Sequence, residues 1–270
     1  MNKRILCLAA FLSAAAVLSG CDSSDITYPD SDQYTVGGAE LKEDVSQICI
    51  GWVSGEIEIQ YHEEDTIVFS ESANQPQTEK ETMRYWLDDD TLNIQFMESG
   101  ERCSETLEKK LTLYLPEHLD NCDFEIHSVS ADISMDGLTA RTVDVNTTSG
   151  DFTAALEYQL KELDIDTVSG NVDVQAGAVD SFEMDSVSGE IKLSVSHTPK
   201  EGTADSVSGN IMLYLPEDAS FRAEAESVSG SVYSDFGMKE NEKDGLYICG
   251  DGESRFEIDT VSGDICFIAE

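Results

Sequence analysis

A tripeptide of the Val-Ser-Gly type recurs along most of this chain at a spacing of about 20 residues. Its serine stands at Ser54, Ser130, Ser149, Ser169, Ser188, Ser208, Ser229 and Ser262. From Ser130 to Ser229 the steps between successive serines are 19, 20, 19, 20 and 21 residues, and the last step is 33. A period of this length indicates a repeat architecture in which each unit buries its apolar side chains against its neighbours.

Apolar and polar residues alternate on both sides of the motif glycine, as in LDIDTVSGNVDV, FEMDSVSGEIKL and FEIDTVSGDICF. Alternation with a period of two around a glycine is typical of a strand, a turn and a second strand. About 20 residues at roughly 3.3 Å each make one coil of two or three short strands, and coils stack about 4.8 Å apart. We therefore predict an all-β fold, a β-solenoid of the β-helix or β-roll type that turns at the Val-Ser-Gly motif.

The alternative is a β-sandwich of hairpins, which would show turns about every 8 to 12 residues without one motif at a fixed phase. In the solenoid, glycine suits the corner because it adopts positive φ without steric cost. The turn glycines are Gly55, Gly150, Gly170, Gly189, Gly209, Gly230 and Gly263. The alternating apolar positions around them are expected to point inward, but the periodicity leaves open whether the motif valine points in or out, because a turn can shift the phase.

Residues 1–20 have the features of a bacterial lipoprotein signal peptide. A short positive segment, Asn2-Lys3-Arg4, precedes an apolar run, and Leu18-Ser19-Gly20-Cys21 matches a lipobox. The run is too short to span a bilayer as a helix. We expect Cys21 to begin the mature chain and to carry a lipid that tethers it to a membrane. The alternative is an ordinary secretory signal peptide in which a cysteine follows a small residue.

The rest of the chain divides into a tether and one repeat domain. Residues 21–45 are acidic and contain few structure signals, which predicts a flexible tether. Residues 46–270 are predicted to form the solenoid, with irregular first coils over 46–120 and regular coils over 121–270. Trp52 and Trp86 are expected to be core or capping aromatics, because an end coil must hide its backbone edge.

The charge and the motifs exclude several classes of function. The chain has 55 acidic against 16 basic residues, a formal charge of -39, which excludes nucleic acid as a partner. No metalloprotease, nucleophile-elbow, P-loop or dinucleotide-binding motif is present, so we expect no enzymatic activity and no cofactor. Five cysteines remain after the signal peptide and Cys21, without a CxxC pair, which argues against a disulfide framework and a zinc site. The disulfide state of these five stays open: Cys49, Cys103, Cys122, Cys249 and Cys266.

Stacked coils would align acidic residues on both sides of the motif. One column precedes it and consists of Asp166, Asp185, Asp205, Glu226 and Asp259, and the other follows it and consists of Asp151, Asn171, Glu190, Asn210 and Asp264. Carboxylates are hard ligands, so the first column is a candidate calcium site. The alternative is a set of solvated acids. Exposed charges about 5 Å apart repel by roughly 0.8 kcal/mol, whereas each buried apolar side chain stabilises by roughly 1.5–3 kcal/mol, so the coils stack without a metal.

The segments GWVSGEIEIQYHEEDTIVFSES and RYWLDDDTLNIQF, followed by repeated TVSG units, resemble the putative-adhesin family of bacterial extracytoplasmic β-strand-repeat proteins, domains of unknown function. The similarity covers nearly all of residues 47–270. It implies a β-solenoid-like fold and a cell-envelope location, often as a lipoprotein, and it carries over no catalytic residues. Ala131 and Thr148 depart from the motif, as does the long last interval.

These observations predict a lipid-anchored, non-enzymatic β-repeat protein of the cell envelope that serves adhesion or surface interaction. Its partner would be an unidentified envelope or extracellular protein or glycan. One alternative is a calcium- or glycan-binding module that uses the acidic turn edge. Another is a carbohydrate-active solenoid enzyme.

Overall fold

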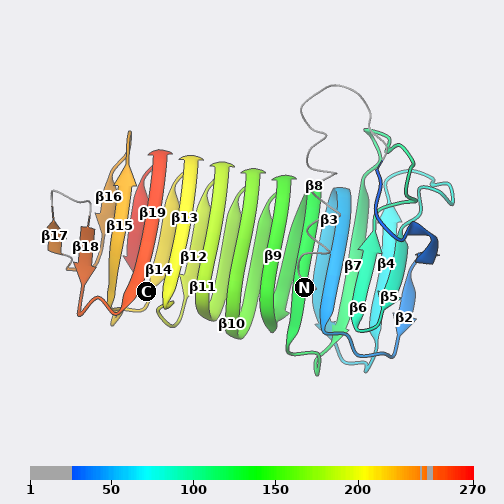
Figure 1. Cartoon of the computed structure of the whole chain (residues 1–270), viewed down its shortest axis with the longest axis horizontal. Helices are drawn as coiled ribbons and strands as arrows, with labels where there is room; N and C mark the ends of the chain where they lie inside the picture. The colour runs from blue at the N-terminus through cyan, green and yellow to red at the C-terminus, as the bar shows by residue number, and fades with distance from the viewer. Residues whose placement is uncertain (1–25, 238, 242–245) are drawn as a thin grey trace.

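The computed structural model describes residues 26–237, 239–241 and 246–270, so the predicted signal peptide and Cys21 lie outside the described residues. Strands dominate this part of the chain, and no helix in it is long and apolar enough to cross a bilayer. The strands lie side by side in an elongated stack (Figure 1). In chain order the elements are η1 (Ser31–Gln33), β1 (Thr35–Val36), β2 (Ala39–Leu41), β3 (Gln47–His62), β4 (Ile67–Ala73), β5 (Arg84–Asp88), β6 (Thr91–Gln95), β7 (Lys109–Pro116), β8 (Cys122–Leu138), β9 (Ala140–Ser149), β10 (Phe152–Ser169), β11 (Val172–Ser188), β12 (Ile191–Val195), β13 (Glu201–Ser208), β14 (Ile211–Leu215), β15 (Phe221–Ser227), β16 (Val232–Ser234), β17 (Lys239–Asn241), β18 (Leu246–Cys249), β19 (Ser254–Ser262) and β20 (Ile265–Ala269).

The regular coils stack in parallel, with equivalent motif positions in register. Ser169 pairs with Ser188, which pairs with Ser208. Strands before the motif glycine form one face in the order β8, β9, β10, β11, β13, β19, β15. Strands after it form the other face in the order β8, β10, β11, β12, β14, β20, β16. The predicted β-solenoid is confirmed, and its serine-glycine corners lie along one edge.

The core lies between the two faces and consists of the alternating apolar residues. The inward positions predicted from the alternation are all buried: Phe124, Ile126, Ile133, Val143, Val145, Phe152, Leu163, Ile165, Val172, Val174, Phe182, Met184, Ile191, Leu193, Ile211, Leu213, Phe256, Ile258, Ile265 and Phe267. Each contributes roughly 1.5–3 kcal/mol of burial free energy. This apolar column, repeated in every coil, holds the stack together.

The coils do not follow one another in sequence order at the C-terminal end. The last coil, β19 and β20, lies between the coil of β13 and β14 and the coil of β15 and β16. The red strand between β13 and β15 in Figure 1 shows this insertion. The 33-residue step of the motif therefore reflects a chain that leaves the stack and returns one place inside it. On its outer side β15 pairs antiparallel with β18, which covers its edge.

At the N-terminal end only β3 forms a coil of the regular kind. It pairs in parallel with β8 on one side and with β6 and β7 on the other. Beyond these strands the pairing is antiparallel: β5 on β6, and β4 on β7. Trp52 is buried beside Phe96, with ring centroids 5.0 Å apart. We call residues 26–116 the N-terminal cap, because its antiparallel strands end the parallel stack.

The predicted flexible tether of residues 21–45 is wrong for its described part. Residues 26–45 are part of the cap and pack on its other strands: β1 pairs with β5 and β2 pairs with β4. Tyr28 is buried, and its hydroxyl donates a hydrogen bond of 2.6 Å to the carbonyl of Met97. Acidic composition predicted solvation, but the few apolar residues of this segment and its backbone groups complete the sheet edge.

The motif glycines are needed chiefly because adjacent coils approach closely. A Cβ on Gly209 would lie 1.8 Å from the carbonyl oxygen of Gly189, and one on Gly170 would lie 2.0 Å from that of Gly150. Of the seven, only Gly55, Gly150 and Gly189 have φ in the left-handed region. The expected reason, positive φ, is therefore wrong for the other four, where backbone contact between coils excludes a side chain.

Ala131 occupies a corner without breaking the stack. Strands β3 and β8 run through this corner without interruption, with Ser54 opposite Ser130 and Gly55 opposite Ala131. The backbone N–H of Ala131 donates to the Ser128 hydroxyl over 2.9 Å. Ala131 therefore lies inside a continuous strand, and its methyl group is buried.

Candidate functional site

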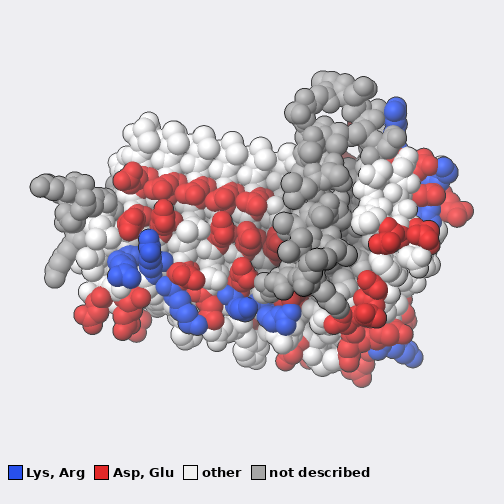
Figure 2. Space-filling view, in the orientation of Figure 1, with Lys and Arg blue, Asp and Glu red and all other residues white. Residues whose placement is uncertain are grey.

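The five acids predicted to align before the motif do form one column. Asp166 pairs with Asp185, then Asp205, Asp259 and Glu226 follow in this spatial order. Their side chains point away from the core, because they alternate with buried residues along each strand. We call this set the first acid column. Figure 2 shows rows of carboxylates running across the coils below an edge of uncharged residues.

A second row of acids lies two residues earlier on each strand, and the sequence analysis did not single it out. It consists of Asp144, Asp164, Glu183, Thr203, Glu257 and Glu224 in spatial order, and we call it the second acid column. Only Thr203 interrupts the carboxylates. The same register that aligned the first column could have revealed the second.

Crowding and burial shift the pKa values of these aspartates. Burial, and then the neighbouring charges Asp144, Asp166, Glu183 and Glu162, raise the pKa of Asp164 to about 7. Burial is also the main cause that raises the pKa of four acids of the first column, Asp166, Asp185, Asp205 and Asp259. The aspartates of the two columns therefore become protonated at a higher pH than isolated aspartates do.

This predicts that the fold becomes more stable as the pH falls from about 7 to about 5. The pKa of Asp164 is about 7 in the fold against 3.8 ordinarily, so between these values the folded chain binds more protons than the unfolded chain. Stability then rises as the pH falls through this window. Because the side chain is half-exposed, we expect Asp164→Asn to add only ~1 kcal/mol at pH 8, about 2–4 °C in Tm.

Thermal melts at pH 5 and pH 8 measure this effect. Asp164→Asn should narrow the gap in Tm between the two pH values. Asp218→Asn, an exposed acid beyond the far end of β14, is the control and should leave the gap unchanged. If the difference in Tm between pH 5 and pH 8 were equal in the Asp164→Asn variant and the unaltered protein, Asp164 would not be a source of the pH dependence.

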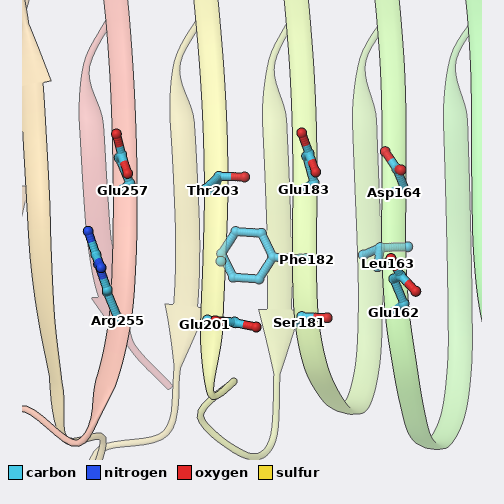
Figure 3. Close-up of a pocket in the computed structure, with 11 residues that line it drawn as sticks. Glu162, Leu163, Asp164, Ser181, Phe182, Glu183, Glu201, Thr203, Arg255 and Glu257 are labelled. Carbon is cyan, nitrogen blue, oxygen red and sulfur yellow. The ribbon is translucent and has the colours of Figure 1, made fainter.

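A shallow pocket of about 420 Å³ opens beside the second acid column. Figure 3 shows Asp164, Glu183, Thr203 and Glu257 in one row above Glu162, Ser181, Glu201 and Arg255. The short side chains of Ser181 and Thr203 leave the hollow among longer acids. Its floor includes Phe182 and Gly202, where the Phe182 ring fills the space that a Gly202 side chain would need. Acids, hydroxyls and one arginine suit hydrogen bonding to a polar group, but they include no nucleophile paired with a base.

The motif valines point outward, which the periodicity had left open. Val168, Val187, Val207 and Val261 are 47–50% exposed, and Val228 is 78% exposed. The first four lie on the same face of their strands as the first acid column, two residues further on, and Val228 follows the end of β15 directly. We call these five side chains the valine ridge. The residue between acid and valine points inward instead, as buried Thr167, Ser186, Ser206 and Thr260 do.

The column that follows the motif has a structural role. The Asp151 carboxylate accepts the backbone N–H of Asn171 over 2.7 Å, and the Asn171 side chain accepts that of Glu190 over 3.1 Å. Asn210 accepts the N–H of Asp264 in the same way over 2.9 Å. These side chains join the corner of one coil to the next.

Metal ligands are not grouped in the described part of the chain. No three of its His, Cys, Asp and Glu side chains are arranged to hold a metal ion. The candidate calcium ligands Asp166, Asp185, Asp205, Asp259 and Glu226 are contributed one per coil along a straight row. The five described cysteines are free thiols. Burial raises the pKa of the Cys122 thiol to about 12, so it is poorly suited to nucleophilic chemistry.

The sequence profile of the Toastrack DUF4097 family matches residues 54–267. The chain belongs to this family. This membership confirms the family resemblance carried by the Trp-containing opening and the TVSG units. No curated protein matches the chain.

Solved structures similar to this Toastrack protein have low sequence identity. A putative adhesin from Bacteroides fragilis is 15% identical, with a TM-score of 0.45, and covers 87% of this chain and 97% of its own. A putative adhesin from Parabacteroides distasonis is 12% identical, with a TM-score of 0.46, over 86% and 96% of the two chains. A putative lipid binding protein from the same species is 14% identical, with a TM-score of 0.37, over 87% and 97%.

Proposed function

We propose that this Toastrack protein is a lipid-anchored, non-enzymatic scaffold of the cell envelope that presents its corner edge to an envelope or extracellular partner. The observation that carries the proposal is the repetition of one outward surface, valine and acid, in five successive coils. Function in such stacks comes from extended surfaces rather than from a single pocket. Solved proteins with the names putative adhesin and putative cell adhesion protein fit such a role.

Location outside the cytoplasm is supported by the N-terminal sequence. The segment Leu18-Ser19-Gly20-Cys21 follows a short apolar run, as in lipoprotein precursors. A lipid on Cys21 would hold the stack at a membrane without a transmembrane helix. The net charge of -39 keeps the domain away from anionic lipid headgroups, so its acid columns stay open to solvent.

We expect Cys21→Ala to abolish attachment of the lipid to the chain and the membrane retention that depends on it. Without the thiol no lipid can attach, and most of the protein should move from the membrane fraction to the soluble fraction or remain as the unprocessed precursor. Fractionation and intact mass of the chain from the native host measure this. Cys103→Ala, a half-exposed thiol in the cap, is the control and should leave the mass of the attached lipid in place. Retention of the Cys21→Ala chain with unchanged mass would reject the anchor.

Capture of envelope partners tests presentation by the corner edge. The unaltered chain and a chain with Asp185→Asn, Asp205→Asn and Asp259→Asn would be cross-linked in the native host and compared by mass spectrometry. Partners lost only from the variant support the proposal. Identical partners for both chains, or turnover of a glycan by the purified protein, would contradict it.

A further inference from the structure

The valine ridge is a continuous apolar strip on a strongly acidic surface. Its five valines come from adjacent coils in the order Val168, Val187, Val207, Val261 and Val228, so at about 4.8 Å per coil the strip extends over about 19 Å. Soluble proteins scatter exposed apolar side chains, and a contiguous strip marks an interaction site. Threonine is equally β-branched and stands at this position in one coil as Thr148. Strand geometry alone therefore does not require valine.

The denser charge beside the ridge lies on one flank. The first acid column lies about 6.6 Å from the valines and the second about 6.6 Å further, since alternate residues of a strand share a face. Neither column contains a lysine or arginine from Asp164 to Glu257 in the stack. The other flank carries fewer acids, and most of its polar side chains are occupied by hydrogen bonds between coils: Asp151, Asn171, Asn210 and Asp264 each accept a backbone N–H, and only Glu190 is an acid with no such contact among the described residues. A partner that is apolar in the middle and cationic on the side of the two acid columns is complementary to this surface.

We propose that the valine ridge and the two acid columns dock an amphipathic α-helix of a partner protein, with a stripe of Lys or Arg along one edge of its apolar face. The proposal names the partner chemistry of the presentation role proposed above and rests on it. A helix of about 13 residues matches the length of about 19 Å, and its turns of 5.4 Å lie close to the coil spacing of about 4.8 Å. Its apolar stripe covers the valines while its cations reach the carboxylates.

Charge complementarity favours a cationic amphipathic helix over a second copy of the chain, an anionic lipid surface or a nucleic acid. A second copy of the chain, docked ridge to ridge, would bring two sets of acid columns together. An anionic lipid surface or a nucleic acid meets the same repulsion. Protonation of the columns toward pH 5 would weaken the attraction, since burial and crowding raise the pKa of these aspartates.

The test measures binding of synthetic peptides to the full chain held in nanodiscs of zwitterionic lipid, with empty nanodiscs as the blank. One peptide of about 18 residues carries a leucine stripe flanked on one side by lysines. A second replaces the lysines by glutamates, and a third replaces the leucines by serines. We expect micromolar binding of the first peptide only, weakened about tenfold by 0.5 M salt.

Two triple variants introduce residues that the chain already has at the equivalent positions of another coil. The first replaces Val187, Val207 and Val261 by threonine, as at Thr148. The second replaces Asp185, Asp205 and Asp259 by asparagine, as at Asn146, which pairs with Asp166 at the end of the first acid column. Each triple variant should weaken binding about tenfold. The control variant also loses three negative charges, but at exposed positions beyond β7 and β14: Glu117→Gln, Glu217→Gln and Asp218→Asn. It should bind the first peptide as tightly as the unaltered chain does.

Several outcomes would overturn the proposal. Equal binding of the first peptide by the threonine variant and the unaltered chain would show that the acids alone attract the peptide and that the ridge has no role. Binding of the serine-substituted peptide would show the same. Self-association of the unaltered chain that the threonine variant lacks would identify a second copy as the occupant, and binding to anionic vesicles would identify a membrane. Failure of the peptide test would leave the result of the Cys21→Ala fractionation unaffected, so the two proposals fail separately.

Discussion

Replacement of Lys109 by alanine should destabilise the N-terminal cap by about 3–5 kcal/mol. The Lys109 side chain is fully buried, and its ammonium group lies 2.7 Å from the Glu71 carboxylate. It also donates hydrogen bonds to the backbone carbonyls of Glu81 and Phe96. Without it, the N–H of Met83 is the one donor left to the Glu71 carboxylate among the described residues, and the carboxylate remains buried as an unpaired charge. Removal of one partner of a buried pair costs far more than the pair itself contributes.

Urea denaturation followed by tryptophan fluorescence measures this loss, because both tryptophans, Trp52 and Trp86, lie in the cap. Lys110→Ala is the matched control. Lys110 is half-exposed and pairs with Glu56 and Glu58, so its removal should cost at most about 1 kcal/mol. A double variant, Lys109→Met with Glu71→Met, should recover most of the loss, since no charge then stays buried. Equal midpoints for Lys109→Ala and Lys110→Ala would contradict the assignment.

The contacts of Lys109 in the cap could not be predicted from the sequence. Residue type alone predicts an exposed lysine, although the alternation in KKLTLYLPE places Lys109 on the same face as the buried Leu111. Lys109 is buried because β4 and the chain around Glu81 and Phe96 cover it. These segments are distant in sequence and share no period. Their antiparallel pairing therefore leaves no repeat signal, whereas the parallel coils do.

The stack itself was predictable because each coil meets a near copy of itself. Alternation identified the buried positions, and the constant period aligned the first acid column. The order of the last coils was not predictable, because the coil of Ser262 and that of Ser229 carry the same motif and fit either place. The direction of Val168 and its equivalents also needed the structure. Alternation continued from Ile165 places Thr167 inward and the valine outward, but a turn at the motif can shift this phase by one residue.

The corner gives the second large effect: Gly209→Val should lower the free energy of unfolding by about 3 kcal/mol or more. A Cβ at this position would lie 1.8 Å from the carbonyl oxygen and 2.8 Å from the carbonyl carbon of Gly189. Both are backbone atoms of the adjacent coil, so no side-chain movement relieves the contact. The coils must separate, and the hydrogen bond of 3.1 Å from the Gly209 N–H to the Ser262 carbonyl is strained on the other side. Each coil is stabilised only by its neighbours, so the damage spreads through both contacts.

Two controls distinguish close contact from backbone conformation. Gly137 has φ of 65° and nothing within 4 Å of an added Cβ, so Gly137→Ala should cost only about 1–2 kcal/mol. Gly209→Ala adds a single carbon where φ is not left-handed, and it should nevertheless cost more than Gly137→Ala. Ser231→Val, at the exposed corner of the outermost coil, should change stability little. Thermal melts followed by far-ultraviolet circular dichroism report on the whole stack. If Gly137→Ala proved the more damaging of the two alanine variants, backbone conformation rather than contact between coils would explain the motif glycine.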